Sequence, residues 1–213
     1  MKHIENIAKL FSKNFVENPL IESFEVGEIY ISSGKLLACD PLLTNDMPSF
    51  ATQFPKGNFK VIIHYEKDTH HIAYIEIVFS ENNCSSWEMA TTPNQEISLL
   101  KKNEIYGFPV ASGMASIMDL ETQTLLNELE NKLYLEKGDD FLGIYQEFFH
   151  DAFFVGNDLQ KNYAFLVPNN NFKNSIFAFD TGENEGFYAS YIGFDELGEP
   201  CKIIMEIIEI GHE

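Results

Sequence analysis

The sequence predicts an α+β protein in which antiparallel β-sheet predominates, folded as a single domain over residues 1–213. Apolar residues make up 45% of the chain, with 19 Phe and 9 Tyr, which is enough to build a substantial core. Residues 59–79 contain two alternating apolar and polar runs around a polar tip, the pattern of a β-hairpin. Four further β-rich runs follow one another closely after residue 162, which is typical of an antiparallel meander.

The first expected element is an amphipathic helix over residues 3–17. Ile7, Phe11 and Phe15 recur at helical spacing, and we expect them to pack this helix against later elements. Pro19 follows the apolar pattern and is suited to end the helix.

Two short β-like runs come next, at residues 25–32 and 35–40, with Ser33 and Gly34 between them. This spacing predicts a tight turn and a hairpin that ends at Asp40 and Pro41. Residues 42–58 are expected to form a loop, and the clear hairpin of residues 59–79 follows it.

The apolar spacing becomes helical after Asp119, which is suited to cap the helix, and Gly138 is suited to end it. A second helical run is expected over residues 141–152. The four later β-rich runs lie at residues 163–167, 175–179, 186–194 and 201–210. We predict that these four runs form one antiparallel sheet with the 59–79 hairpin.

The chain is strongly acidic, with 33 Asp and Glu against 14 Lys, no Arg and a net charge of −19. Nucleic acids and anionic membranes are bound mainly through Lys and Arg, so this composition argues against both as partners. Residues 119–213 carry 19 acids and five lysines. This excess either keeps the protein soluble or forms a surface that attracts a basic protein partner.

Several features favour a cytoplasmic protein. No apolar run approaches the ~20 residues that a membrane helix needs. The first residues include Glu5 and Lys9, which a secretory signal peptide would not carry in its apolar region. Cys39, Cys84 and Cys201 are too widely spaced for a zinc or dithiol motif, so we expect reduced, buried thiols.

Common catalytic motifs do not occur in the sequence. We find no GxxxxGK[ST], GxGxxG, HExxH or GxSxG pattern, and we interpret the internal histidines as structural or solvated. This favours a non-catalytic protein and predicts no cofactor.

Residues 179–200, FDTGENEGFYASYIGFDELGEP, are the leading candidate for a functional surface. Their candidate interaction residues are Asp180, Glu183, Glu185, Phe187, Tyr188, Tyr191, Asp195 and Glu196. Three interpretations are open: turns that serve only the fold, an acidic edge that binds a protein, and a metal or catalytic site. Read as a calcium loop from Asp180, the segment has Glu185 where a glycine is needed, so we predict no micromolar Ca²⁺ or Mg²⁺ site.

Three segments combine glycine, proline and acids in a distinctive way, and we call them the first, second and third blocks. They are residues 34–42 (GKLLACDPL), residues 106–119 (YGFPVASGMASIMD) and residues 181–200. The matching positions are Gly34, Ala38, Asp40 and Pro41, then Gly107, Pro109, Val110, Gly113 and Asp119, then Gly182, Gly186, Tyr188, Gly193, Asp195, Gly198 and Pro200.

Together the blocks resemble a bacterial family known as domain of unknown function 4241. The third block departs from that pattern, because Glu183, Asn184 and Glu185 replace Trp, Gly and Asp. The resemblance implies a bacterial cytoplasmic protein and brings no established activity.

Three hypotheses follow. The first is a non-catalytic binding protein, most concretely an immunity-type protein that neutralises a basic toxin domain. The second is a metal-dependent hydrolase that uses Asp40, Asp119, Asp180 and Asp195. The third is a scaffold without a site.

Overall fold

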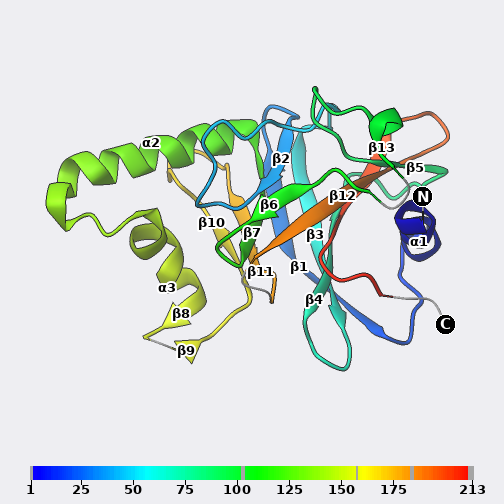
Figure 1. Ribbon diagram of the computed structural model, residues 1–213, viewed down its shortest axis with the longest axis horizontal. Coiled ribbons are helices and arrows are strands. Elements are labelled where there is room, and N and C mark those ends of the chain that lie inside the picture. The colour runs from blue at the N-terminus through cyan, green and yellow to red at the C-terminus, as the bar shows by residue number, and fades with distance from the viewer. Residues whose placement is uncertain (1, 102–103, 157, 183–184, 211–213) are drawn as a thin grey trace.

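The structure is a computed structural model that describes residues 2–101, 104–156, 158–182 and 185–210 (Figure 1). Two antiparallel β-sheets pack face to face and enclose the main apolar core. Helix α1 (Lys2–Phe11) covers the outer face of the larger sheet, and helices α2 (Leu120–Lys137) and α3 (His150–Phe153) cover the smaller sheet. The predicted α+β class with mainly antiparallel sheet is therefore confirmed.

The larger sheet has seven strands, and all of its pairs are antiparallel. Six strands follow the order β1 (Ile21–Ile31), β3 (Gly57–Glu66), β4 (Ile72–Val78), β13 (Pro200–Glu206), β12 (Gly186–Phe194) and β5 (Ser86–Met89). The seventh, β6 (Phe108–Val110), pairs with the other end of β12. Strands β3 and β4 form the hairpin that the sequence predicts.

The smaller sheet has four strands, in the order β10 (Tyr163–Leu166), β11 (Ile176–Asp180), β7 (Met114–Asp119) and β2 (Leu36–Cys39). A separate ribbon pairs β8 (Phe154–Val155) with β9 (Asp158–Leu159). Short 3₁₀ segments lie at Ile97–Leu99 and Gly138–Asp140. No helix within the described residues combines the length and apolar character needed to cross a bilayer.

Two predicted pairings are wrong. Strands β1 and β2 form no hairpin with each other, because β1 pairs with β3 and β2 pairs with β7. The C-terminal runs form no single meander, because β10 and β11 belong to the smaller sheet while β12 and β13 belong to the larger one. Strand β2 is buried along its whole length, so it needs cover on both faces, which an isolated hairpin would not provide.

The N-terminal helix is shorter than the predicted range of residues 3–17. Ile7 and Phe11 are buried as expected, but the helix ends at Phe11 and Phe15 is 60% exposed. The hydroxyl of Ser12 donates to the carbonyl of Ala8 at 2.6 Å and accepts from the indole of Trp87 at 3.1 Å. These bonds direct the chain away from the helix axis, so Phe15 leaves the packed face.

Helix α2 begins and ends as predicted. The carboxylate of Asp119 accepts a hydrogen bond from the backbone N–H of Glu121, and Gly138 terminates the helix at a φ of +56°. The second predicted helical run forms as Tyr145–Phe149, with π-helical bonding, followed by α3. In Figure 1 the far end of α2 extends beyond the sheets and the chain returns through α3, β8 and β9. We call the described residues within 130–160 the arm.

Candidate functional site

The three blocks lie where the chain crosses between the two sheets. Residues 32–35 lead from β1 to β2, residues 111–113 lead from β6 to β7, and the third block begins between β11 and β12. The acids of these blocks hold the crossings in place, as their hydrogen bonds show.

Asp119 holds the first crossing to the start of α2. Its fully buried carboxylate accepts from the backbone N–H of Ser33 at 3.0 Å and from the hydroxyls of Ser33 at 2.9 Å and Ser32 at 3.1 Å. With the N–H of Glu121 at 2.9 Å, it accepts four hydrogen bonds. Asp119 is therefore both a helix cap and a link between distant segments.

Asp40 has the same role at the second crossing. It is buried at the end of β2 and accepts from the backbone N–H groups of Ala111 at 3.0 Å, Ser112 at 2.8 Å and Leu42 at 2.9 Å. These backbone donors fix the carboxylate between the end of β2 and the loop that leads from β6 to β7.

Asp180 and Asp195 each organise a turn. Asp180 accepts from the N–H of Gly182 at 2.8 Å. Asp195 accepts from the N–H groups of Glu199 and Leu197 and from the side chain of Asn82. Donation from the backbone of Glu199 and from the amide of Asn82 lowers the pKa of Asp195. Each of the four acids of the hydrolase hypothesis thus accepts hydrogen bonds at a different turn or crossing. Within the described residues, no three His, Cys, Asp or Glu side chains lie close enough to share a metal ion.

The candidate interaction residues of the third block do not form one surface. Asp180, Glu185 and Phe187 lie near the start of β12, whereas Asp195 and Glu196 follow its end. Nine residues of extended strand separate the two ends, which corresponds to roughly 27 Å. Glu183 lies outside the described residues.

Phe187 is exposed as predicted, but Tyr188 and Tyr191 are not. Tyr188 packs beside Phe108 in the core between the sheets, and Tyr191 is fully buried on the opposite face, under α1. Strand β12 lies inside the larger sheet and is covered on both faces, so its alternating pattern exposes neither tyrosine.

A groove of about 280 Å³ lies between the arm and two of the crossings. Its lining residues are Ser112, Gly113, Met114, Tyr145, Phe153, Phe154, Leu159, Asp180 and Gly182. Asp180 is therefore the one residue of the predicted interaction surface that lines this groove. Thr181 lies next to it and joins the two crossings, since its N–H and its hydroxyl both donate to the carbonyl of Gly113 at 3.0 Å.

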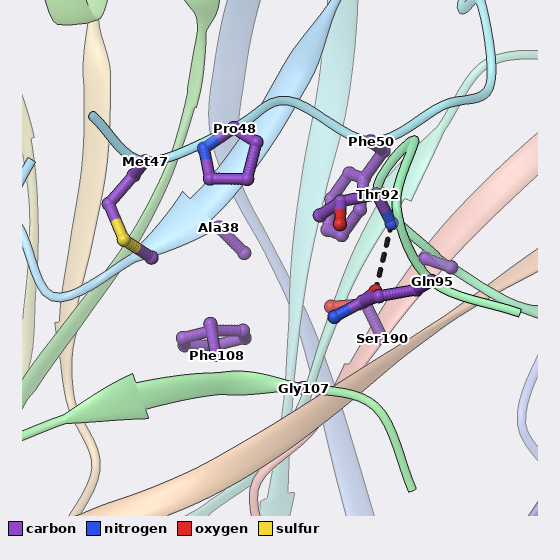
Figure 2. A pocket seen from close by; sticks show the side chains of 10 residues that line it. Ala38, Met47, Pro48, Phe50, Thr92, Gln95, Gly107, Phe108 and Ser190 are labelled. Atoms are coloured by element: carbon purple, nitrogen blue, oxygen red, sulfur yellow. Dashed lines mark hydrogen bonds between the residues drawn. The ribbon is translucent and has the colours of Figure 1, made fainter. Parts of the chain in front are cut away.

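A second, more enclosed cavity of about 180 Å³ adjoins the core between the sheets (Figure 2). It is lined by Ala38, Met47, Pro48, Phe50, Ala90, Thr92, Gln95, Gly107, Phe108 and Ser190. All three blocks contribute a wall residue, namely Ala38, the Gly107–Phe108 pair and Ser190. A Cβ at Gly107 would lie 2.3 Å from the carbonyl oxygen of Tyr188, so the close approach of these backbones requires glycine.

The hydroxyl of Ser190 is the unusual feature of this cavity. The residue is only 2% exposed, and its hydroxyl oxygen has no hydrogen-bond partner among the described residues. Buried hydroxyl groups nearly always make at least one hydrogen bond. This site was not predicted from the sequence, although Ser190, a polar residue in the apolar run of β12, was a signal for it.

Buried charges lie under α1, on the outer face of the larger sheet. The imidazole of His64 lies 2.7 Å from the hydroxyl of Ser23 and 2.9 Å from the carboxylate of Glu76. The connectivity is that of a serine–histidine–carboxylate triad, but Lys202 neutralises Glu76 through an ion pair at 2.7 Å. Burial alone would raise the pKa of Glu76; the His64 hydrogen bond and the Lys202 charge outweigh it and hold this pKa low. We therefore interpret the group as structural.

Glu206 is buried on the same face of the larger sheet. One of its oxygens lies 3.0 Å from the His3 ring nitrogen and accepts from the Tyr191 hydroxyl at 3.3 Å, while the other has no partner among the described residues. Burial raises the pKa of Glu206, and the neighbouring His3 does not offset this effect.

The comparison with family models supports the resemblance seen in the blocks. A family model described as Protein of unknown function (DUF4241) matches residues 29–205, which include all three blocks and every residue that lines the two cavities described above. Comparison with curated proteins and with solved structures gave no match. Since the family model covers far more than half of the chain, the protein belongs to the DUF4241 family.

Proposed function

We propose that this protein is a non-catalytic protein-binding module whose partner is a basic protein, and that the partner docks on the arm and its groove. The observation that carries the proposal is the exposure of apolar side chains along the arm. They are Tyr134, Leu135, Leu142, Tyr145, Val155 and Leu159. Apolar side chains gathered on one protruding segment mark an interaction site more often than scattered ones do.

The charge of the arm indicates the chemistry of the partner. Residues 130–160 contain seven acids and two lysines. Both lysines are engaged within the arm, Lys137 with Glu147 and Lys132 with Glu136. The remaining acids lie between the apolar side chains in sequence, so a complementary partner presents Lys or Arg around an apolar anchor.

The groove gives the partner a place for such an anchor. Tyr145, Phe153 and Leu159 provide apolar walls, and Asp180 provides a carboxylate at the opposite side. An immunity-type protein that neutralises a basic toxin domain is the narrower form of this proposal, because an acidic surface accelerates association with a basic protein. A cytoplasmic bacterial setting accords with three free, buried cysteines and with the family match.

The test begins with capture of partners from the native organism and measures binding kinetics for the captured protein. We expect a basic partner whose association rate falls severalfold when salt rises from about 0.1 M to about 0.5 M, because exposed charges are then screened within a few ångströms. An acidic partner, or an association rate that ignores salt, would contradict the proposal.

A pair of matched variants then locates the surface. Leu135→Ser combined with Leu142→Ser removes two arm side chains that are 81% and 73% exposed. The control combines Leu197→Ser with Leu99→Ser, which are 85% and 71% exposed and lie outside the arm. We expect dissociation to accelerate about tenfold in the arm variant and to stay unchanged in the control. Equal dissociation rates for the two variants would show that the partner does not dock on the arm.

A further inference from the structure

We infer that the cavity next to Ser190 binds a small uncharged molecule, a single six-membered ring that carries one hydroxyl or carbonyl group. This inference does not depend on the proposed protein partner, because the cavity and the groove beside the arm share no lining residue.

The volume of the cavity sets the size of the ligand. An apolar cavity of about 150 Å³ holds benzene. The cavity at Ser190 measures about 180 Å³, so it has room for one ring and a small substituent.

The lining sets the charge of the ligand. None of the ten residues that line the cavity is charged, and Ala38, Met47, Pro48, Phe50 and Phe108 give it apolar walls. A charged ligand would lose its hydration here without gaining a counter-charge. The phenyl rings of Phe50 and Phe108 offer flat surfaces suited to an aromatic ring.

The polar group of the ligand is set by Ser190 and Gln95. The side-chain oxygen of Gln95 accepts from the N–H of Thr92 at 2.9 Å, which leaves its amide N–H groups to act as donors. Figure 2 shows the Gln95 and Ser190 side chains among those that line the cavity, and within the described residues no hydrogen bond joins the two. A ligand hydroxyl placed there accepts from Gln95 and donates to Ser190, which gives the buried serine its missing partner.

The ligand can enter between two loops. Pro48 is exposed, and Met47, Thr92 and Gln95 are half-buried, so these residues form the mouth. Ala38, Phe108 and Ser190 are buried and form the inner wall. Gln95 thus lies at the mouth and Ser190 on the inner wall of the cavity.

Phenol is the probe of choice, with toluene as its match without the polar group and benzoate as a charged control. Binding is followed through protein amide chemical shifts. We expect phenol to saturate one site below about 10 mM, toluene to bind more weakly, and benzoate not to bind. The shifts should centre on β2, β6 and β12, which carry the inner wall. Failure of phenol to saturate, shifts centred elsewhere, or equal binding of benzoate would overturn the inference.

Variants separate the polar contact from the cavity itself. Ser190→Ala should weaken phenol about three- to tenfold, the effect of one lost hydrogen bond, and leave toluene unchanged. Ala38→Leu should fill the cavity and abolish binding of both probes, with circular dichroism to confirm folding. Thr92→Phe at the half-buried mouth blocks the same space from the solvent side and replaces Ala38→Leu if that variant does not fold. Phenol binding that survives the filling variant, or that Ser190→Ala leaves unchanged, would overturn the assignment.

Discussion

Replacing Asp119 with alanine should destabilise the protein severely. The variant removes the cap of α2 and three hydrogen bonds to Ser32 and Ser33. Loss of a helix cap costs about 0.5–2 kcal/mol, and each hydrogen bond to a charged group contributes about 1.5–3 kcal/mol. Both serines are half-buried and can turn to water in the variant, so the contributions do not add fully. We expect a loss of about 3–4 kcal/mol in the free energy of unfolding.

Urea unfolding followed by circular dichroism measures this loss. The urea concentration at the unfolding midpoint should fall, while the slope of the unfolding free energy against urea concentration stays unchanged. In a thermal scan the same loss corresponds to a drop in Tm of roughly 6–16 °C for a chain of this size. Glu121→Ala is the matched control, because Glu121 is exposed and, among the described residues, its carboxylate accepts only from the Ser32 hydroxyl, which it shares with Asp119; this variant should cost less than about 1 kcal/mol. If Asp119→Ala lies within about 1 kcal/mol of the wild type, the interpretation of Asp119 as a structural link is wrong.

Three further predictions concern the buried groups and the acidic turns. Glu206→Gln should raise the free energy of unfolding at pH 7. Burial raises the pKa of Glu206, so its contribution to stability is present below its unfolded pKa and is lost as pH rises through its folded pKa. Equal urea midpoints for variant and wild type at pH 7 would contradict this, and the gain should shrink near pH 4. Burial raises the pKa of the Cys39 and Cys84 thiols to about 12. A thiol reagent at pH 8 should therefore label neither cysteine until the protein unfolds. Labelling of either cysteine within the mixing time would show that its thiol is accessible in the folded protein. Calorimetric titration with Ca²⁺ or Mg²⁺ should give no one-to-one isotherm of micromolar affinity, and an isotherm that Asp180→Ala abolishes would support the metal hypothesis.

Local sequence patterns predicted the helices and strands well, but they did not predict which strands pair with each other. The cap at Asp119, the stop at Gly138 and the 59–79 hairpin all depend on residues close in sequence, and the structure confirms each of them. An alternating pattern states which side chains share a face, but it does not state which strand lies alongside. Strand β2 therefore looked like the return strand of a hairpin, although its partner β7 lies more than 70 residues away.

The candidate sites were harder to predict, for a related reason. Asp40 and Asp119 stood out in sequence as acids near glycines, but their role depends on N–H groups from distant loops. The cavity brings together Ala38, Gly107 and Ser190, which no spacing rule connects. The exposed apolar residues of the arm were also missed, because helical periodicity does not show where a helix extends beyond its support.

The buried charges under α1 determine how the strands of the larger sheet can align. Lys202 in β13 and His64 in β3 both reach Glu76 in β4, so one carboxylate connects three strands. Because side chains alternate between faces, a slip of β13 by one residue would turn Lys202 toward the apolar core between the sheets and leave Glu76 without its cation. An unpaired buried charge of this kind costs about 3–5 kcal/mol, whereas an all-apolar face would tolerate the slip. Glu76, Lys202 and His64 thus distinguish the native alignment from its nearest competitor, and apolar residues at all three positions should weaken the preference for the native register.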